Sequence, residues 1–244
     1  MSGAGPPRPL LAVDGLSVSY GEAKAVSGIS FALDGGRAVA VLGANGSGKS
    51  SLAAALVGVV RPSAGRVSFD GVDITRWPAH RVSRAGIAYV PEGRGIYPHL
   101  TVTDNLRAML RYAVPRGDRE HALERAVELF PVLGERRKQA AGTLSGGEQQ
   151  MLSLARVLAA PPKLLVADEM SLGLAPKMVD VVFESLTRAK AAGVTVVLVE
   201  QYVERALTLA DDAIVLRQGV IAWSGAAADA HREVAASYLG GEPR

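Results

Sequence analysis

The order of apolar and polar positions predicts short strands at both ends of the chain and helices in its middle. Between residues 10 and 42 the apolar stretches LLAVDGLSVSY, VSGISFAL and RAVAVLG are separated by turns that contain glycine. A hairpin is predicted at GRVSFDGVDI, where Asp70 and Gly71 suit a turn with positive φ. Two buried strands, KLLVAD and VTVVLVE, flank a helical stretch at 176–193, and a last hairpin is predicted around Gly219.

Helical patterns fill residues 98–160. TVTDNLRAMLRYA begins with a Thr or Asp cap, and DREHALERAVELF places one apolar stripe on Ala122, Leu123, Ala126, Val127 and Phe130. We therefore expect an α/β fold with a mainly parallel sheet, an antiparallel β subdomain and an inserted α-helical subdomain. The expected divisions are a disordered leader at 1–9, a core at 10–91 and 161–244, and the helical subdomain at 92–160.

Composition excludes several classes of protein. The 244 residues suffice for one large domain with an insertion, and the apolar runs are far shorter than the roughly 20 residues that span a bilayer. Without cysteine the chain has no disulfides or thiolate metal sites, and its four histidines, His80, His99, His121 and His231, are too scattered for a metal cluster. The charge of +3 is spread out and aromatic residues are few, so no nucleic-acid partner is expected. Since MSGAGPPRP lacks the apolar segment of a signal peptide, we expect a cytosolic protein.

The segment GANGSGKS has the spacing of a phosphate-binding loop, with a strand before it and a helix after it. In that context the backbone N–H groups converge on an anion at the positive end of the helix. Lys49 is expected to reach the β- and γ-phosphates of a nucleotide, and the Ser50 hydroxyl to bind Mg²⁺. A plain glycine-rich turn is the alternative, but it does not explain the Lys-Ser pair. The nucleotide-binding residues are taken as Gly43, Ala44, Asn45, Gly46, Ser47, Gly48, Lys49, Ser50 and Ser51.

A carboxylate pair follows the buried strand KLLVAD. Asp168 ends this strand at the edge where open α/β sheets bind ligands, so it is the expected second anchor for Mg²⁺. Glu169 comes next and could orient and activate the attacking water. Alone, the pair could simply cap a strand; the phosphate loop favours the catalytic interpretation.

The segment TLSGGEQQMLSLAR begins a helix with a capping box formed by Ser145 and Glu148. Its buried stripe is predicted to comprise Met151, Leu154, Ala155 and Leu158. The capping box does not explain Gly146 and Gly147, because each glycine forgoes roughly 1 kcal/mol of helix propensity relative to alanine. We therefore interpret this helix start as a second anion site, for a nucleotide held by another subunit.

Together, LSGGEQQ, the phosphate loop and LLVADE resemble the ATP-binding subunits of ABC transporters over nearly the whole chain. The resemblance implies a P-loop NTPase fold of the ABC ATPase type, with ATP and Mg²⁺ as ligands. It also implies a head-to-tail dimer in which each ATP lies between one phosphate loop and the partner's signature residues Ser145, Gly146, Gly147 and Glu148. Tyr20 matches the aromatic residue that stacks on adenine, with an ordinary strand tyrosine as the alternative.

Three positions depart from the usual pattern of that family. Glu92 replaces a glutamine and could still coordinate Mg²⁺, and Ala175 replaces an aspartate. Gln201 replaces a histidine that contacts the γ-phosphate; its neutral amide donates a hydrogen bond but cannot become cationic. The resemblance therefore implies Glu169, Lys49 and Gln201 as the catalytic residues, while the strength of hydrolysis stays open.

The three departures lie in the segments YVPEGRGIYP, SLGLAP and VEQ. Together these segments resemble the F-type ATP-binding subunit of branched-chain amino acid importers, whose relatives also serve urea and short amides. The implied partners are a G-type paralogue or a second copy, two membrane permeases and, indirectly, an external solute-binding protein. The implied location is peripheral, on the cytoplasmic face of the cell membrane. Arg94 and Tyr97 are candidates for the permease contact, although generic surface residues would look the same.

Two other functions stay open at this point. A nucleotide-binding regulatory module with little hydrolysis would fit Gln201 and Ala175. A soluble ABC ATPase of repair or translation fits less well, because such proteins usually carry two cassettes or long coiled-coil insertions, and neither occurs in this sequence.

Overall fold

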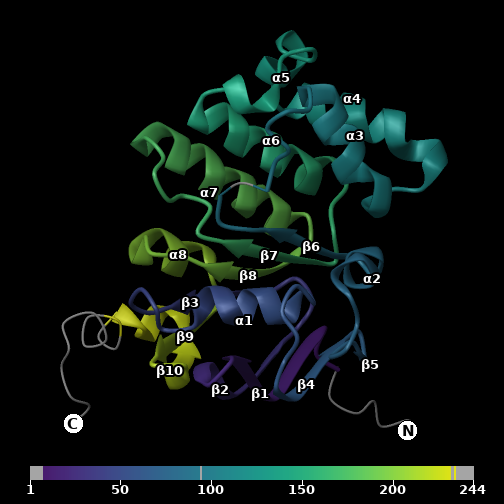
Figure 1. Cartoon of the computed structure of the whole chain (residues 1–244). Helices are drawn as coiled ribbons and strands as arrows, with labels where there is room; N and C mark the ends of the chain where they lie inside the picture. Colours follow the sequence, from purple (N-terminus) through teal and green to yellow (C-terminus); the bar gives the residue numbers. More distant parts are fainter. Residues whose placement is uncertain (1–7, 94, 232–233, 235–244) are drawn as a thin grey trace, which may run out of the picture.

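The computed structural model describes residues 8–93, 95–231 and 234, so most of the leader expected at 1–9 lies outside the described residues. The strands form two sheets (Figure 1). The smaller sheet is antiparallel, as the N-terminal hairpins predict, and has the order β2-β1-β4-β5. Its strands are β1 (Leu11–Tyr20), β2 (Ala23–Leu33), β4 (Ala64–Phe69) and β5 (Val72–Asp73).

The larger sheet has the order β10-β9-β3-β8-β7-β6. Five of its strands run parallel, and β10 pairs antiparallel with β9 through the predicted hairpin at Gly219, whose φ is +80°. Strands β3, β7 and β8 are buried at every position, which explains their unbroken apolar runs. The strands are β3 (Ala38–Leu42), β6 (Ile87–Val90), β7 (Leu164–Asp168), β8 (Thr195–Val199), β9 (Asp212–Arg217) and β10 (Val220–Ala226).

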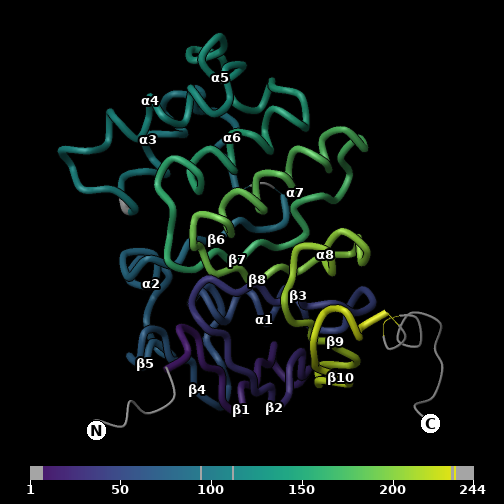
Figure 2. Tube along the Cα trace, turned by 180° about the vertical axis from the view of Figure 1, so that it is seen from behind, coloured from purple at the N-terminus to yellow at the C-terminus, as the bar shows by residue number. Residues whose placement is uncertain are grey.

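Helices cover both faces of this larger sheet (Figures 1 and 2). Helix α1 lies between the two sheets, whereas α7 and, at β6, α6 connect the larger sheet to the block formed by α3 to α6. No helix in the described part of the chain is both long and apolar enough to cross a bilayer. The helices are α1 (Lys49–Leu56), α2 (Ala79–Arg84), α3 (Val102–Ala113), α4 (Arg119–Leu129), α5 (Pro131–Glu135), α6 (Gly146–Ala159), α7 (Pro176–Ala191) and α8 (Val203–Leu209).

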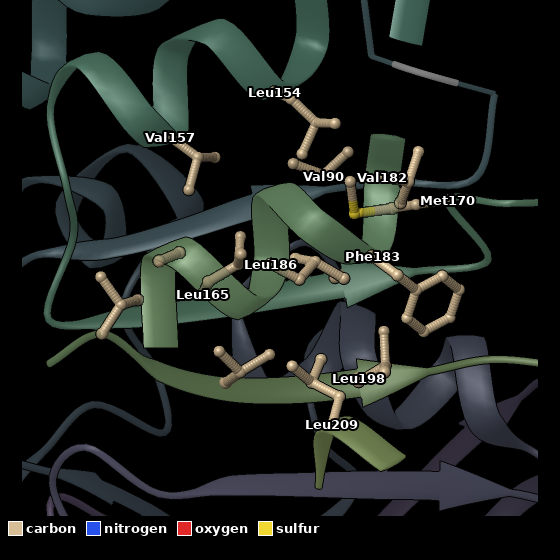
Figure 3. Close-up of a cluster of buried hydrophobic side chains, with 14 of the residues drawn as sticks. Val90, Leu154, Val157, Leu165, Met170, Val182, Phe183, Leu186, Leu198 and Leu209 are labelled. Carbon is tan, nitrogen blue, oxygen red and sulfur yellow. The ribbon is translucent and has the colours of Figure 1, made fainter. Parts of the chain in front are cut away.

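Two hydrophobic cores lie on opposite faces of the larger sheet, because alternate strand residues point in opposite directions. On one face Leu165 and Leu198 pack with Leu154 of α6 and Leu186 of α7 (Figure 3). On the other face, alternate residues of β3 and β8 join α1 and the antiparallel sheet. The helical block therefore shares its core with the sheet, which fixes the start of α6 relative to the phosphate loop.

The predicted helices over α3, α4, α6 and α7 are present, and Thr101 caps α3 by accepting a hydrogen bond from the Asp104 N–H. The predicted stripe of α6 is wrong in part. Met151 and Leu158 are only partly buried, whereas Leu152 and Val157 are fully buried, because α6 packs against α3, α4 and α7 at once. A helix enclosed on several sides buries more than one stripe.

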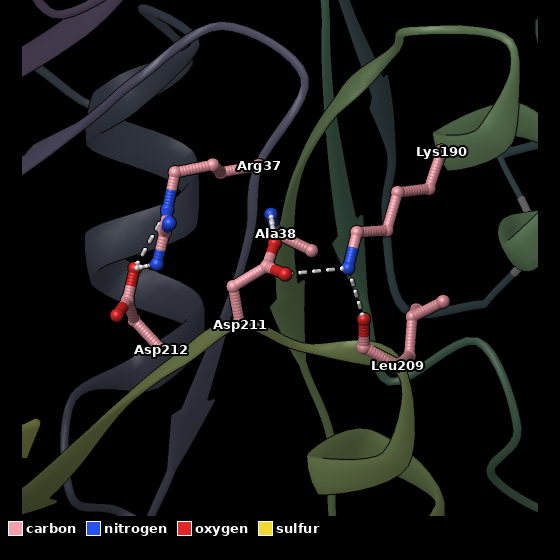
Figure 4. A network of polar contacts seen from close by, with 6 residues as sticks. All are labelled: Arg37, Ala38, Lys190, Leu209, Asp211 and Asp212. Carbon is pink, nitrogen blue, oxygen red and sulfur yellow. Dashed lines mark hydrogen bonds and ion pairs between the residues drawn. The ribbon is translucent and has the colours of Figure 1, made fainter. Parts of the chain in front are cut away.

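A polar network ties four segments together at the end of the larger sheet where β3 begins (Figure 4). Asp211 accepts hydrogen bonds from the Ala38 N–H at 2.8 Å and from Lys190 Nζ at 2.9 Å, and Lys190 also donates to the Leu209 carbonyl. Arg37 pairs with Asp212 at 2.8 Å. Burial raises the pKa of Asp211, but the Ala38 N–H and the Lys190 ammonium outweigh it and hold this pKa below its usual value.

Candidate functional site

The loop between β3 and α1 is shaped by glycines that leave no space for a side chain. A Cβ at Gly43 would lie 2.3 Å from the Leu216 carbonyl oxygen, and one at Gly48 would lie 2.3 Å from the Ala25 carbonyl oxygen. Both glycines also have positive φ, as does Gly46, which faces open space. The loop is therefore clamped to the core at its two ends and open for close approach at Gly46.

Lys49 lies under this loop and is almost completely buried. Its Nζ donates to the carbonyl oxygens of Gly43, at 2.9 Å, and Ala44, at 3.1 Å. The same atom lies 3.9 Å from Glu169 Oε1. Burial lowers the pKa of Lys49, while the charges of Glu169 and Asp168 act in the opposite direction. The ammonium is thus held in place, directly beside the loop.

The Asp168 carboxylate, at the end of β7, faces the start of α1. Ser50 Oγ donates to its Oδ1 and Tyr89 Oη donates to its Oδ2, both at 3.2 Å. Burial raises the pKa of Asp168 to about 6, although the two hydrogen bonds lower it. Sequence reasoning missed Tyr89; its only signal was a hydroxyl-bearing residue in the short strand IAYV, which ends before Glu92.

These groups fit a magnesium-bound phosphate chain. Mg²⁺ prefers oxygen ligands, and the oxygen atoms of Ser50 and Asp168 lie side by side at the loop. Ser47 Oγ is buried inside the loop without a hydrogen-bond partner in the described part of the chain. A phosphate oxygen is an acceptor of the kind that such a hydroxyl requires.

Glu169 has an unusual backbone conformation for a residue with a side chain, with φ of +47°. Its N–H donates to the Val199 carbonyl at 2.9 Å, and its Oε2 accepts a hydrogen bond of 3.0 Å from Gln201 Nε2. The side chain is therefore held between the Gln201 amide and the Lys49 ammonium.

A pocket of about 570 Å³ brings most of the sequence-predicted residues together. Tyr20 and Glu92 lie on its rim with Leu172, which the sequence did not single out. Asp168 is not among the lining residues; it is buried and hydrogen-bonded to Ser50, which lines the pocket. The lining includes Tyr20, Asn45, Gly46, Gly48, Lys49, Ser50, Ser51, Glu92, Glu169 and Gln201.

The start of α6 forms the predicted capping box. Glu148 N–H donates to Ser145 Oγ at 3.3 Å, and Ser145 N–H donates to Glu148 Oε2 at 2.8 Å. None of Ser145, Gly146, Gly147 and Glu148 is among the residues that line the pocket. A Cβ at Gly147 would lie 2.8 Å from the Met178 side chain, a contact within the chain that sequence reasoning missed.

Two other sequence-predicted positions lie away from this chemistry. Ala175 precedes α7 as its N-cap and makes no side-chain capping bond. Tyr97 is 55% exposed, and its backbone is held by two hydrogen bonds to the Asn105 side chain. Arg94 lies outside the described residues.

The family model described as "ABC transporter" matches residues 26–171. The chain belongs to the ABC transporter family. Relatives described as transport ATP-binding proteins align with most of this chain. The high-affinity branched-chain amino acid transport ATP-binding protein BraG of Pseudomonas aeruginosa is 42% identical, covering 95% of this chain and 100% of the relative.

Two further relatives have similar names. The probable branched-chain amino acid transport ATP-binding protein LivF of Archaeoglobus fulgidus is 38% identical, covering 77% of this ABC-type chain and 80% of the relative. BraF, a second high-affinity branched-chain amino acid transport ATP-binding protein of P. aeruginosa, is 30% identical, covering 87% and 89%. The predicted resemblance to this group of ATP-binding subunits is therefore confirmed.

Solved structures confirm the predicted ABC ATPase fold. The ADP conformation of MJ1267, an ATP-binding cassette of an ABC transporter, superimposes with a TM-score of 0.80 at 25% identity. The match covers 96% of this chain and 100% of that chain.

Proposed function

We propose that this chain is an ATP-hydrolysing subunit of an importer for branched-chain amino acids, on the cytoplasmic face of the membrane. The observation that carries the chemistry is the position of Glu169, whose carboxylate lies between Lys49 Nζ and Gln201 Nε2 at the pocket. The names of BraG and LivF, and the share of each chain that aligns, support branched-chain amino acids as the cargo. Since an ATPase subunit does not bind the transported solute, its own residues do not identify the cargo.

Each part of the pocket has a role toward MgATP. The loop N–H groups and the Lys49 ammonium hold the phosphates, because they concentrate positive charge at the start of α1. Ser50 and Asp168 hold Mg²⁺, with Glu92 as a further oxygen ligand from the rim. Tyr20, which is exposed and lines the same pocket, stacks on the adenine.

Glu169 orients and deprotonates the attacking water, as a carboxylate fixed beside the phosphate loop can do. Gln201 keeps this carboxylate in place through its amide and stays neutral at every pH. Negative charge that develops on the transferred phosphoryl group is stabilised by the Lys49 ammonium, and a Mg²⁺ ion held by Ser50 and Asp168 would supply further positive charge there.

The exposed start of α6 serves the nucleotide of a second ATP-binding subunit. The N–H groups of Gly146 and Gly147 and the Ser145 hydroxyl form an anion site outside this chain's own pocket. BraG and BraF occur in one organism under the same description, which supports a pair of different subunits over a pair of copies. Two permeases complete the assembly, and an external solute-binding protein delivers the cargo.

Phosphate release by the purified chain, with its second ATP-binding subunit, tests the enzymatic part. Glu169→Gln is expected to keep ATP affinity within about threefold while turnover falls by on the order of 10²- to 10³-fold, the loss seen when one transition-state stabiliser is removed. Glu184→Gln, an exposed carboxylate on α7, is the matched control. Equal turnover in the wild type and Glu169→Gln would contradict the role of Glu169, and absent turnover would favour a regulatory module.

Reconstitution with the permeases and the solute-binding protein tests the cargo. ATP turnover in proteoliposomes is expected to rise with leucine, isoleucine or valine and to stay at its basal level with urea or acetamide. Stimulation by urea or acetamide alone would replace the proposed cargo with an amide.

A further inference from the structure

Glu200, directly after β8, is a buried carboxylate that the chemistry described so far does not use. Glu200 is 1% exposed, so its side chain is almost completely removed from water. Oε1 accepts from the Ser171 N–H at 3.1 Å, and Oε2 accepts from Ser171 Oγ at 2.5 Å and from the Gln201 N–H at 3.2 Å. Ser171 is itself fully buried.

This carboxylate is held by hydrogen bonds alone. Within the described residues, no lysine, arginine or histidine lies within ion-pair distance of Glu200. Burial raises the pKa of Glu200, and the hydrogen bonds from Ser171, Gln201 and the Tyr202 backbone oppose that rise. A buried charge is costly unless such bonds satisfy it, so these donors must stay in place around it.

The donors come from two different segments. Ser171 lies two residues after Glu169, in the loop that leads from β7 to α7, whereas Gln201 and Tyr202 follow β8. The loop has an irregular backbone, in which Glu169 and Gly173 both have positive φ. Leu172 in this loop is exposed on the pocket rim. Glu200 therefore connects the loop that carries Glu169 to Gln201, the residue that donates a hydrogen bond to Glu169.

We propose that Glu200 is a positioning residue, which holds the Glu169–Ala175 loop against Gln201 and so keeps the Glu169 carboxylate aligned for hydrolysis. The predicted effect on kcat rests on the proposed ATPase function. The predicted role of Glu200 in holding the loop does not depend on ATP turnover. Glu200 itself lies behind the pocket and is not among the lining residues.

Glu200→Gln is a sharp test because the shape is kept and one acceptor is lost. Both Oε positions face a backbone N–H, from Ser171 and from Gln201. Whichever way the new amide lies, its NH₂ group must face one of these N–H groups, and two donors repel. Ser171→Ala removes only the hydroxyl bond to Oε2, so its effect should be smaller.

Hydrogen–deuterium exchange of the purified chain measures the connection itself. Glu200→Gln is expected to speed exchange in peptides that cover 169–175 and 200–203 by about tenfold or more. Ser171→Ala should speed it less, and the double variant should add little to Glu200→Gln. Ser185→Ala is the matched control, since it removes a buried hydroxyl bond within α7, to the Val181 carbonyl, and should leave both peptides unchanged.

Phosphate release then measures the consequence. Glu200→Gln should lower kcat by about 10- to 100-fold while KM for ATP changes less than threefold, because the phosphate loop is untouched. Unchanged exchange in both peptides, or equal loss in Ser185→Ala, would overturn the proposal. Faster exchange with unchanged kcat would overturn the positioning role. If the wild type does not hydrolyse ATP, the proposed function fails, and the exchange experiment still decides whether Glu200 holds the loop.

Discussion

Gln201 Nε2 donates a hydrogen bond of 3.0 Å to Glu169 Oε2, joining residues that follow β8 and β7. The other oxygen of the same carboxylate lies 3.9 Å from Lys49 Nζ. Gln201 occupies the position that is usually a histidine in the ABC pattern. It is therefore hydrogen-bonded directly to the carboxylate that we propose as the catalytic base.

Gln201→Ala is expected to lower kcat by about 10- to 100-fold. A hydrogen bond to a charged group is worth about 1.5–3 kcal/mol, and its loss leaves the Glu169 carboxylate free to turn away from the pocket. ATP affinity should stay within about threefold, because the phosphate loop is unchanged. The measurement is steady-state phosphate release with equilibrium nucleotide titration. A fall in affinity equal to the fall in kcat would show that Gln201 acts on binding instead.

The pKa of Asp168 predicts a pH-dependent stability. In the folded chain it is raised to about 6 from 3.8, so the folded state binds this proton more tightly than the unfolded state does. The contribution of Asp168 to stability therefore grows as the pH falls from about 7 to about 4.

Asp168→Asn removes this dependence. In the absence of nucleotide, the variant is expected to exceed the wild type in unfolding free energy at pH 7.5 by roughly 1–2 kcal/mol, and the difference should shrink at pH 5. Urea unfolding at the two pH values measures it. A constant difference between the two pH values would contradict a raised pKa.

Variants at Gly147 distinguish packing within the chain from close approach by a partner subunit. Gly147→Ala would place its Cβ 2.8 Å from Met178, while alanine gains about 1 kcal/mol of helix propensity. The double variant Gly147→Ala with Met178→Ala relieves the internal clash. It is expected to restore the melting temperature of the wild type but not ATP turnover, because the new methyl group still covers the start of α6. Recovery of turnover in the double variant would show that Gly147 serves internal packing alone.

The polar network around Asp211 predicts an acid-sensitive contribution to stability. The pKa of Asp211 lies below its usual value, so its stabilisation is present at neutral pH and is lost as the pH falls through that lowered pKa. Asp211→Asn is expected to cost about 1–3 kcal/mol at pH 7, since it weakens partly buried hydrogen bonds to Ala38 and Lys190. The cost should shrink as the pH falls below 3.8 toward the lowered pKa. A cost that stays constant over that fall in pH, measured by urea unfolding, would contradict this assignment.

The sequence predicted the α/β fold, the phosphate loop and the capping box because each depends on residues close together in the chain. The glycine spacing and the strand before Gly43 are local, and so is the pairing of Ser145 with Glu148. It did not predict α2, β6 or α8, whose patterns are too short to distinguish from loops.

The missed parts of the site are contacts between distant segments. Tyr89 and Asp168 lie on neighbouring strands, but 79 residues apart in the sequence. Ser171 and Glu200 meet only because β7 and β8 are adjacent and parallel. The Met178 contact with Gly147 likewise requires α6 and α7 to pack together. Strand order and helix packing decide these contacts, and no single stretch of the sequence contains that information.

The central claim is that ATP lies between the phosphate loop of one subunit and the start of α6 in another. Analytical ultracentrifugation with MgATP tests it directly on Glu169→Gln, alone and with the second ATP-binding subunit, against the same chain carrying Ser145→Arg in addition. We predict a nucleotide-dependent dimer for Glu169→Gln, and a monomer of unchanged ATP affinity once Ser145→Arg is present. A dimer that persists with Ser145→Arg, or an ATP affinity that collapses with it, would contradict the account.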